Sequence, residues 1–337
     1  MDLPILGLTL GLIPVLLFLV GLRYLDSFKL VRLRDVLITL FVGACAAGLS
    51  FLANRGLTSL LELDWDVVSR YVAPAIEEQL KGAFLLYLIV RGRVGFMVDA
   101  AIRGFAIGAG FALVENIHYM QALPDAAAGV WVVRGLGTAI MHGGTTAIIG
   151  IMAKTFLERT GAHPLLAGFP GIFTAIILHS VFNHFILSPG LSTLVVLIVF
   201  PLAVIFVFNR SEQSTRVWLG VGFDTDQELL EMITSGELAG TRIGRYLQTL
   251  ERKFPPAVVA DMLCYLRVHL ELTIQAKGVL LMRDAGFEVQ TDPELKEKFE
   301  ELRYLDKSIG KTGILALRPF LHSSTHDLWQ LYILESK

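Results

Sequence analysis

The chain has 337 residues, of which 54% are hydrophobic and 18% charged, and its formal net charge is −2. Soluble domains carry about a quarter charged residues, so this composition is typical of membrane proteins. A net charge near zero leaves no basic footprint for a polyanion, and nucleic acid is therefore excluded as an expected partner. Cys45 and Cys264 lie in regions of different polarity, so we expect no disulfide framework and no cysteine-based zinc site.

Long apolar segments fill the first ~210 residues, and a spanning helix needs about 20 of them. The pattern predicts about seven spans, at residues 3–22, 36–53, 67–90, 101–120, 130–152, 164–187 and 190–208. No basic region precedes the first segment, so we expect it to remain as a span rather than be removed as a signal peptide. On the fourth segment, Gly104, Gly108 and Ala112 form a stripe of small residues that predicts close helix packing.

Positive charges lie in alternate loops of this arrangement. They are Arg23, Lys29, Arg32 and Arg34 after the first segment, Arg91 and Arg93 after the third, Lys154 and Arg159 after the fifth, and Arg210 and Arg216 after the seventh. By the positive-inside rule, the sequence predicts a multi-pass protein of the cell membrane with its N-terminus outside and its C-terminal region in the cytoplasm.

The remaining residues, 210–337, show helical rather than strand-like patterns. Capping boxes at 225–228 and 291–294 predict two helix starts, and we expect four or five helices in a small bundle. The predicted fold is thus all-α, with a membrane helix bundle at 1–209 and a small cytoplasmic helical domain at 210–337. This second domain shows no catalytic or metal motif, and we expect it to bind a cytoplasmic partner, to self-associate or to regulate the first.

Polar residues interrupt four of the predicted spans. They are Glu77, Glu78 and Lys81 on the third span, Glu115 and Asn116 on the fourth, His142 on the fifth, and His179 and Asn183 on the sixth. An ionisable group at mid-membrane costs about 2.5–3.5 kcal/mol on insertion scales, so each needs a partner or a function. Counted from the outer helix ends, the glutamates and histidines lie roughly 8 to 18 Å deep. This common depth predicts one site in the outer half of the bilayer.

Spacing within the helices refines this prediction. Glu77 and Lys81 are separated by four positions and can pair, and the same spacing lets His179 and Asn183 point at one centre. Glu77 and Glu78 lie about 100° apart on their helix, so they do not face one point equally. We therefore expect one of the two carboxylates to take part in chemistry and the other to be satisfied structurally.

These residue types support hydrolysis of an acyl bond such as a peptide. Ser180 follows His179 directly and points elsewhere, so no serine nucleophile is indicated. A carboxylate can act as general base on water, while histidine and asparagine donate hydrogen bonds to the developing oxyanion. This mechanism uses no cofactor. Alternatively, Glu115, His142 and His179 supply three protein ligands for a catalytic zinc ion.

A different class of protein also accommodates buried polar groups. In a non-catalytic membrane scaffold, receptor or transporter, the same residues hold the helix bundle together through hydrogen bonds and ion pairs. A transporter favours internal repeats and broken helices at the midplane, and the sequence shows no convincing repeat. The common depth of the polar residues on four spans therefore favours the enzyme.

Four motifs carry a family resemblance. They are Glu77-Glu78-x-x-Lys81, Phe111-x-x-x-Glu115-Asn116, His142, and His179-x-x-Phe182-Asn183. Taken in this order on successive spans, over about residues 1–210, they resemble the PrsW family of intramembrane proteases. That family is related to the CAAX prenyl proteases and the bacteriocin-processing enzymes.

The resemblance implies a glutamic-type intramembrane endopeptidase. Glu77 and Glu78 would activate water, and His179 and Asn183 would stabilise the oxyanion. Glu115 stands where the CAAX relatives usually have histidine, a departure that keeps a metal possible. The family's role in site-1 cleavage of a single-span anti-sigma factor implies a membrane-anchored protein as the substrate. Lys81 and Asn116 would then support the reacting groups.

Overall fold

The computed structural model describes residues 3–160, 163–287, 293–321, 329 and 334. Within these ranges the chain is built from helices and contains no strand, so the predicted all-α class is confirmed. It folds as two compact units, Met1–Glu212 and Gln213–Lys337, called the first and the second unit below.

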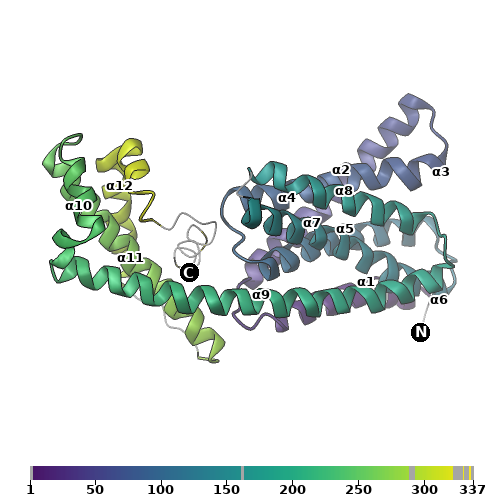
Figure 1. The fold of residues 1–337 in the computed structure, drawn as a ribbon. Helices are drawn as coiled ribbons and strands as arrows, with labels where there is room; N and C mark the ends of the chain where they lie inside the picture. Colours follow the sequence, from purple (N-terminus) through teal and green to yellow (C-terminus); the bar gives the residue numbers. More distant parts are fainter. Residues whose placement is uncertain (1–2, 161–162, 288–292, 322–328, 330–333, 335–337) are drawn as a thin grey trace. The chain divides into compact units, whose positions relative to one another are not determined.

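The first unit is a bundle whose helices run roughly side by side (Figure 1). Its elements are α1 (Leu3–Tyr24), α2 (Leu33–Leu61), α3 (Trp65–Val67), η1 (Val68–Val72), α4 (Ala73–Val90), α5 (Met97–Ala122), α6 (Ala128–Val132), η2 (Val133–Thr138), α7 (Ala139–Thr160), α8 (Pro164–Asn183) and the start of α9 (Pro189–Thr234). Proline opens α8 and α9, where its missing N–H leaves no intrahelical hydrogen bond unmade. The segments η1 and η2 are π-helical, a widened geometry that often marks functional sites.

Helix α5 forms the core of the first unit and packs against α1, α2 and α7. Every residue from Val98 to Ala112 is buried. Glycine makes this close packing possible: a Cβ added at Gly108 would lie 2.1 Å from the carbonyl oxygen of His142, and one at Gly104 would lie 2.7 Å from that of Thr146. The predicted close packing of the small-residue stripe is therefore confirmed, and it fixes the backbone of His142 against α5.

Six helices in the described part of the chain are long and apolar enough to cross a membrane. They are Gly7–Tyr24, Leu33–Leu61, Met97–Ala122, Ala128–Thr160, Leu165–Asn183 and Pro189–Thr234. The predicted span at 67–90, which corresponds to α3, η1 and α4, is not among them, because α4 carries Glu77, Glu78 and Lys81. The count of seven is thus not confirmed. All three of these charged residues are buried inside the bundle.

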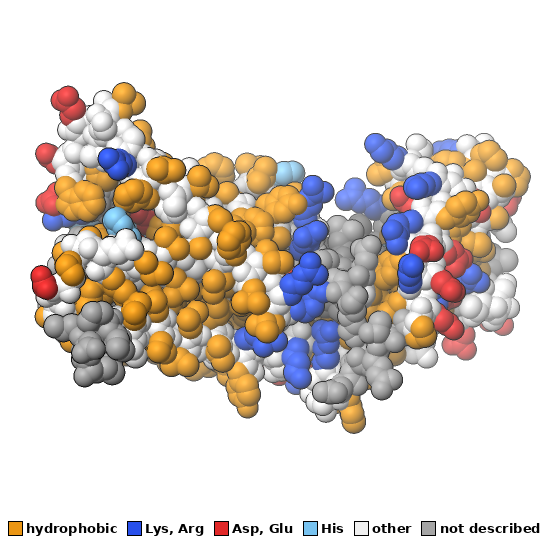
Figure 2. Space-filling view, turned by 180° about the vertical axis from the view of Figure 1, so that it is seen from behind, with side chains coloured by type: hydrophobic (Ala, Val, Ile, Leu, Met, Phe, Trp, Pro, Cys, Tyr) orange, Lys and Arg blue, Asp and Glu red, His pale blue; other side chains and the backbone are white. Residues whose placement is uncertain are grey.

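Hydrophobic side chains also cover the outside of the first unit (Figure 2). Phe41 on α2, Phe173 on α8 and Phe206 on α9 are 67%, 66% and 71% exposed. A soluble protein rarely exposes apolar side chains over so wide a surface. The apolar exterior is what contact with lipid requires.

The second unit comprises the end of α9, η3 (Glu237–Gly240), α10 (Arg242–Leu250), α11 (Pro256–Asp284) and α12 (Leu295–Leu317). Two hydrophobic clusters share α11, one around Met262 and Leu266 and the other around Leu272 and Phe299. The helix start predicted at Thr225 is wrong, because Thr225 lies inside α9 and its hydroxyl donates to the carbonyl of Val221 at 2.9 Å. The other predicted helix start, at 291, lies outside the described residues.

Candidate active site

Five buried or half-buried side chains from four helices meet inside the first unit. Glu77 and Glu78 come from α4, Glu115 from α5, His142 from α7 and His179 from α8, and together they are called the Glu–His cluster below. The two histidine rings stand perpendicular to each other with centroids 4.8 Å apart. The structure thus brings together five of the six residues that the sequence proposed for catalysis.

Glu78 is the most firmly held member of the cluster. Its Oε1 accepts hydrogen bonds from Lys81 Nζ at 2.6 Å, from His179 Nδ1 at 2.8 Å and from Thr145 Oγ1 at 3.2 Å. Lys81 therefore pairs with Glu78 at three positions' separation, and the predicted pairing of Lys81 with Glu77 is wrong. The second oxygen, Oε2, is buried and has no hydrogen-bond partner among the described residues.

His179 is oriented by Glu78 and faces Glu77. A carboxylate only accepts hydrogen bonds, so the bond to Glu78 places the ring proton on Nδ1 and leaves a lone pair on Nε2. That Nε2 lies 3.9 Å from Glu77 Oε2. Both glutamates thus approach one histidine, but at unequal distances of 2.8 Å and 3.9 Å, in line with the expectation that they do not face one point equally. Glu78 is the more firmly held of the two carboxylates through its Oε1, and Glu77 lies farther from His179.

His142 bridges Lys81 and Glu115. Its Nδ1 lies 3.1 Å from Lys81 Nζ, and its Nε2 lies 3.0 Å from Glu115 Oε2. An ammonium group can only donate, so Nδ1 accepts from Lys81 and Nε2 donates to Glu115. Phe111 packs beside this pair, with Lys81 Nζ 4.8 Å from its ring centroid. Lys81 therefore supports two members of the cluster, which agrees with the supporting position that the sequence gave it.

Arg134, from the π-helical segment η2, was not identified from the sequence. Its guanidinium lies 3.1 Å from Glu115 Oε2, donates from Nε to Asn116 Oδ1 at 2.9 Å, and covers the Tyr119 ring at 3.7 Å. Asn116 in turn donates to the carbonyl of Gly11 on α1 at 2.7 Å. In the sequence, Arg134 sits at the start of a predicted span, where a basic residue is ordinarily interfacial.

Asn183 lies outside the cluster. Its Nδ2 donates to the carbonyl of Ser69 at 2.8 Å, and Ser180 Oγ donates to the carbonyl of Arg70 at 2.6 Å. Both acceptors belong to the π-helical segment η1, so these bonds fasten the end of α8 to the turn that precedes α4. The geometry does not support the predicted convergence of Asn183 with His179, nor the oxyanion role that depended on it.

Three members of the cluster form a candidate metal site. One ligand atom each from Glu77, His142 and His179 lie within 4.8 Å of one another, and all three residues are buried. The zinc set proposed from the sequence contained Glu115 instead of Glu77, and the Glu115 carboxylate pairs with Arg134 at 3.1 Å and with His142 Nε2 at 3.0 Å. Catalytic zinc sites often use two histidine nitrogens and one carboxylate oxygen as ligands. In such sites the second ring nitrogen of a histidine ligand usually donates a hydrogen bond to another carboxylate, which orients the ring. The residues therefore fit zinc.

Apolar helices around a buried cluster of glutamates and histidines indicate a multi-pass membrane protein with a candidate active site inside its helix bundle. The model of the PrsW family, described as intramembrane metalloproteases, matches residues 32–208, slightly more than half of the chain. The chain belongs to the PrsW family of intramembrane proteases, as its motifs indicated. No curated protein and no solved structure matches it. The matched range contains the whole Glu–His cluster.

Proposed function

We propose that the chain hydrolyses a peptide bond of a membrane-anchored protein at the Glu–His cluster. Membership of the PrsW family supports proteolysis inside the membrane. One observation carries the location: Glu77, His142 and His179, from three different helices, offer ligand atoms within 4.8 Å in a buried position. Catalysis by water activation needs such a group, fixed by its surroundings and shielded from bulk solvent.

Zinc is the cofactor that this donor set favours, held by Glu77, His142 and His179. Bound zinc supplies a nucleophilic hydroxide at neutral pH and polarises the scissile carbonyl. The chain's own contribution is orientation. Glu78 holds Nδ1–H of His179 at 2.8 Å, which keeps Nε2 turned toward Glu77, and Glu115 restrains the ring of His142 at 3.0 Å.

A metal-free, glutamic-type mechanism is the second candidate, and the partners of His142 favour it. Both of its ring nitrogens are engaged, by Lys81 and by Glu115, so metal binding requires one of these bonds to be exchanged. In this mechanism Glu77, whose carboxylate faces Nε2 of His179 at 3.9 Å, takes the proton from water. His142 and His179 then stand beside the developing negative charge.

The substrate we infer is a single-span membrane protein, with an anti-sigma factor cut at site 1 as the specific candidate. The motif resemblance and the outer-half depth of the cluster in the predicted topology support it. The same topology has the N-terminus outside and the second unit in the cytoplasm. There the second unit would bind a partner or a second copy of the chain.

Replacing Glu77 by Gln tests the assignment under either mechanism, because the amide keeps the side chain's shape and removes both the metal-binding anion and the general base. We expect cleavage of a single-span reporter in proteoliposomes to fall by about 10²–10⁴-fold. The matched control is Glu62→Gln, at the exposed end of α2. Normal cleavage by correctly folded Glu77→Gln protein would remove the assignment.

Metal analysis of the purified protein then distinguishes the two mechanisms. The zinc mechanism predicts about one zinc ion per chain in the purified protein. His179→Ala and treatment with a chelator should each remove the zinc and, with it, the activity. The glutamic mechanism predicts cleavage that withstands chelation in metal-depleted protein.

A further inference from the structure

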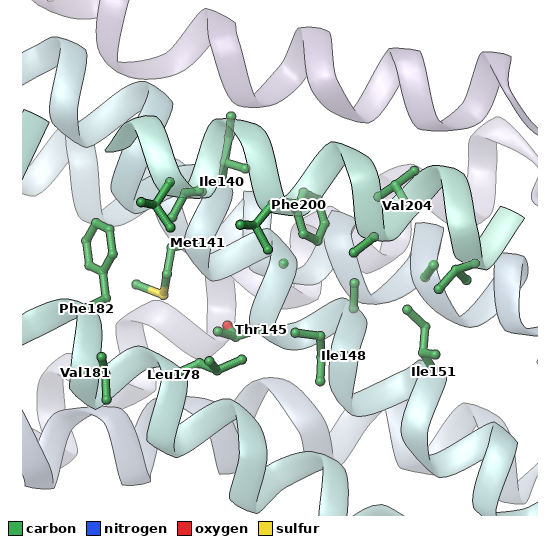
Figure 3. Close-up of a pocket in the computed structure, with 18 of the residues that line it drawn as sticks. Ile140, Met141, Thr145, Ile148, Ile151, Leu178, Val181, Phe182, Phe200 and Val204 are labelled. Carbon is green, nitrogen blue, oxygen red and sulfur yellow. The ribbon is translucent and has the colours of Figure 1, made fainter. Parts of the chain in front are cut away.

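We propose that an apolar groove between α7, α8 and α9 is the docking site for the membrane-spanning segment of the substrate; this inference rests on the proposed function. The groove has a volume of about 390 Å³. Figure 3 shows its wall, with Met141, Thr145 and Ile148 on α7, Leu178 and Phe182 on α8, and Phe200 on α9. Among the described residues that line it, only Thr145 and Ser192 carry polar side chains.

The groove adjoins the Glu–His cluster through its wall. Met141 and Leu178 line it and directly precede His142 and His179 in the sequence. Thr145 lines it as well, and its hydroxyl donates to Glu78 Oε1 at 3.2 Å. An occupant of the groove is therefore separated from the cluster by a single layer of side chains.

Helix packing leaves this side of the bundle open. Helix α7 packs closely with α5 and α8, whereas α9 approaches α7 and α8 only sparsely along the part of the chain that the structure describes. Gly144 and Ala147 line the groove, and the ring of Phe200 on α9 packs against Gly144. On α9, Val195 and Val199 line the groove and are still 45% and 57% exposed.

The shape and chemistry of the groove fit a helix that runs parallel to α9. Lining residues extend along α9 from Ser192 to Phe208, which corresponds to about 24 Å of helix. That length approaches the ~30 Å hydrocarbon core of a bilayer. Family membership already requires a membrane-embedded substrate. An apolar spanning segment is thus the occupant that matches the lining, the length and the position beside the cluster.

Disulfide crosslinking tests the docking site without depending on catalysis. The full chain would carry Glu77→Gln, Cys45→Ser and Cys264→Ser, with one new cysteine at Val199 in the groove or at Leu202, which is 62% exposed on the same helix and outside the groove. The probe is a single-span protein that the wild-type chain cleaves, with one cysteine in its span.

We expect at least about ten-fold more crosslinked product from Val199→Cys than from Leu202→Cys, because only the first faces the occupied groove. Equal yields, or no crosslink at either position, would overturn the proposal. A crosslink from Val199→Cys to a second copy of the chain instead of the probe would show that the groove serves self-association. This result would also overturn the proposal.

Bulky substitutions give a second measurement in otherwise wild-type protein. Val199→Trp fills the groove, and overpacking of this kind should lower kcat/KM for the single-span probe roughly ten-fold, mainly through KM. Leu202→Trp should leave it unchanged, and unchanged cleavage by Val199→Trp protein would contradict docking. If Glu77→Gln protein still cleaves, the proposed function fails, while the crosslinks still report whether the groove is occupied.

Discussion

The first unit contains two groups of buried charges, and they differ in how fully their atoms are paired. In one, Arg103 lies 2.5 Å from Asp99 Oδ1 and 3.4 Å from Asp35 Oδ2, while the backbone N–H of Gly95 donates to Asp99 Oδ2. Each of these charged side chains has at least one oppositely charged partner. We call this group the closed network.

The Glu–His cluster is incompletely paired by comparison. Oε2 of Glu78 is buried without a hydrogen-bond partner among the described residues, and Glu77, beside Asn54, lies 3.9 Å from Nε2 of His179. A buried polar group left unpaired costs about 1–3 kcal/mol, which natural proteins tolerate where a ligand or a proton completes it. Burial of charge alone therefore does not identify a site. In the Glu–His cluster, the unpaired Oε2 of Glu78 beside two histidines adds the capacity to take up a ligand or a proton.

The largest effect should follow from removing a histidine of the open cluster. We expect His179→Ala to lower kcat for a single-span substrate by about 10²–10⁴-fold, because the ring no longer stands between Glu77 and Glu78. His184→Ala, five residues further along the chain, is the matched control, since His184 contacts the Tyr71 hydroxyl rather than the cluster. Similar rates for the two variants would contradict the view that the incompletely paired cluster is the reactive group of buried charges.

The closed network should behave in the opposite way. Arg103→Met leaves Asp35 and Asp99 buried with less compensation, and we expect it to destabilise the fold by about 3–5 kcal/mol. The molecules that remain folded should cleave at a normal rate. Unfolding by denaturant in detergent measures the first effect, with Arg91→Met, at an exposed arginine, as the reference. A stable but inactive Arg103→Met protein would show that the closed network takes part in catalysis.

Arg134 connects the open cluster to the surrounding helices, so its effect should be intermediate. Losing a residue that supports a metal ligand or a reacting group typically lowers activity about 10–100-fold, and we expect Arg134→Gln to fall in this range. Because Arg134 positions Glu115, the change should appear in kcat with KM nearly constant. A change confined to KM would assign Arg134 to substrate binding instead.

The smallest effect should come from Thr145. The Thr145 hydroxyl has one proton and two acceptors, Glu78 Oε1 at 3.2 Å and the carbonyl oxygen of His142 at 3.1 Å. Thr145→Val keeps the side chain's shape and removes this hydroxyl, a loss of about 1 kcal/mol or roughly five-fold in rate. Thr146→Val is the matched control, because the Thr146 hydroxyl donates only to the carbonyl of His142. Equal rates in a cleavage assay of both variants would show that this contact does not contribute.

Sequence reasoning predicted the convergence of the glutamates and histidines, because buried charges on four helices at one depth need one another. It did not predict which carboxylate Lys81 pairs with, since positions three and four residues apart are both neighbours on a helix. Asn183 binds Ser69 because η1 is π-helical, and no residue pattern signals a π-helical turn. Arg134 reaches Glu115 for a similar reason, through the turn η2.

The span at 67–90 and the length of α9 also differ from the prediction. The span at 67–90 has the expected position, but its three buried charges exclude it from the helices that qualify as spans by composition. Helix α9 continues from the last predicted span to Thr234, because nothing at its predicted end breaks a helix. The groove beside it depends on how loosely α9 packs, which is a tertiary property.

The most direct test compares the same chemical change in the two groups of buried charge. Glu77→Gln and Asp99→Asn each convert a buried carboxylate to an amide, and cleavage of a single-span substrate per folded molecule is measured in proteoliposomes. Our account predicts that Glu77→Gln loses cleavage by about 10²–10⁴-fold while folding normally, and that Asp99→Asn keeps it at reduced stability. Cleavage retained by Glu77→Gln protein, or lost only in Asp99→Asn protein, would contradict the assignment of the Glu–His cluster as the hydrolytic centre.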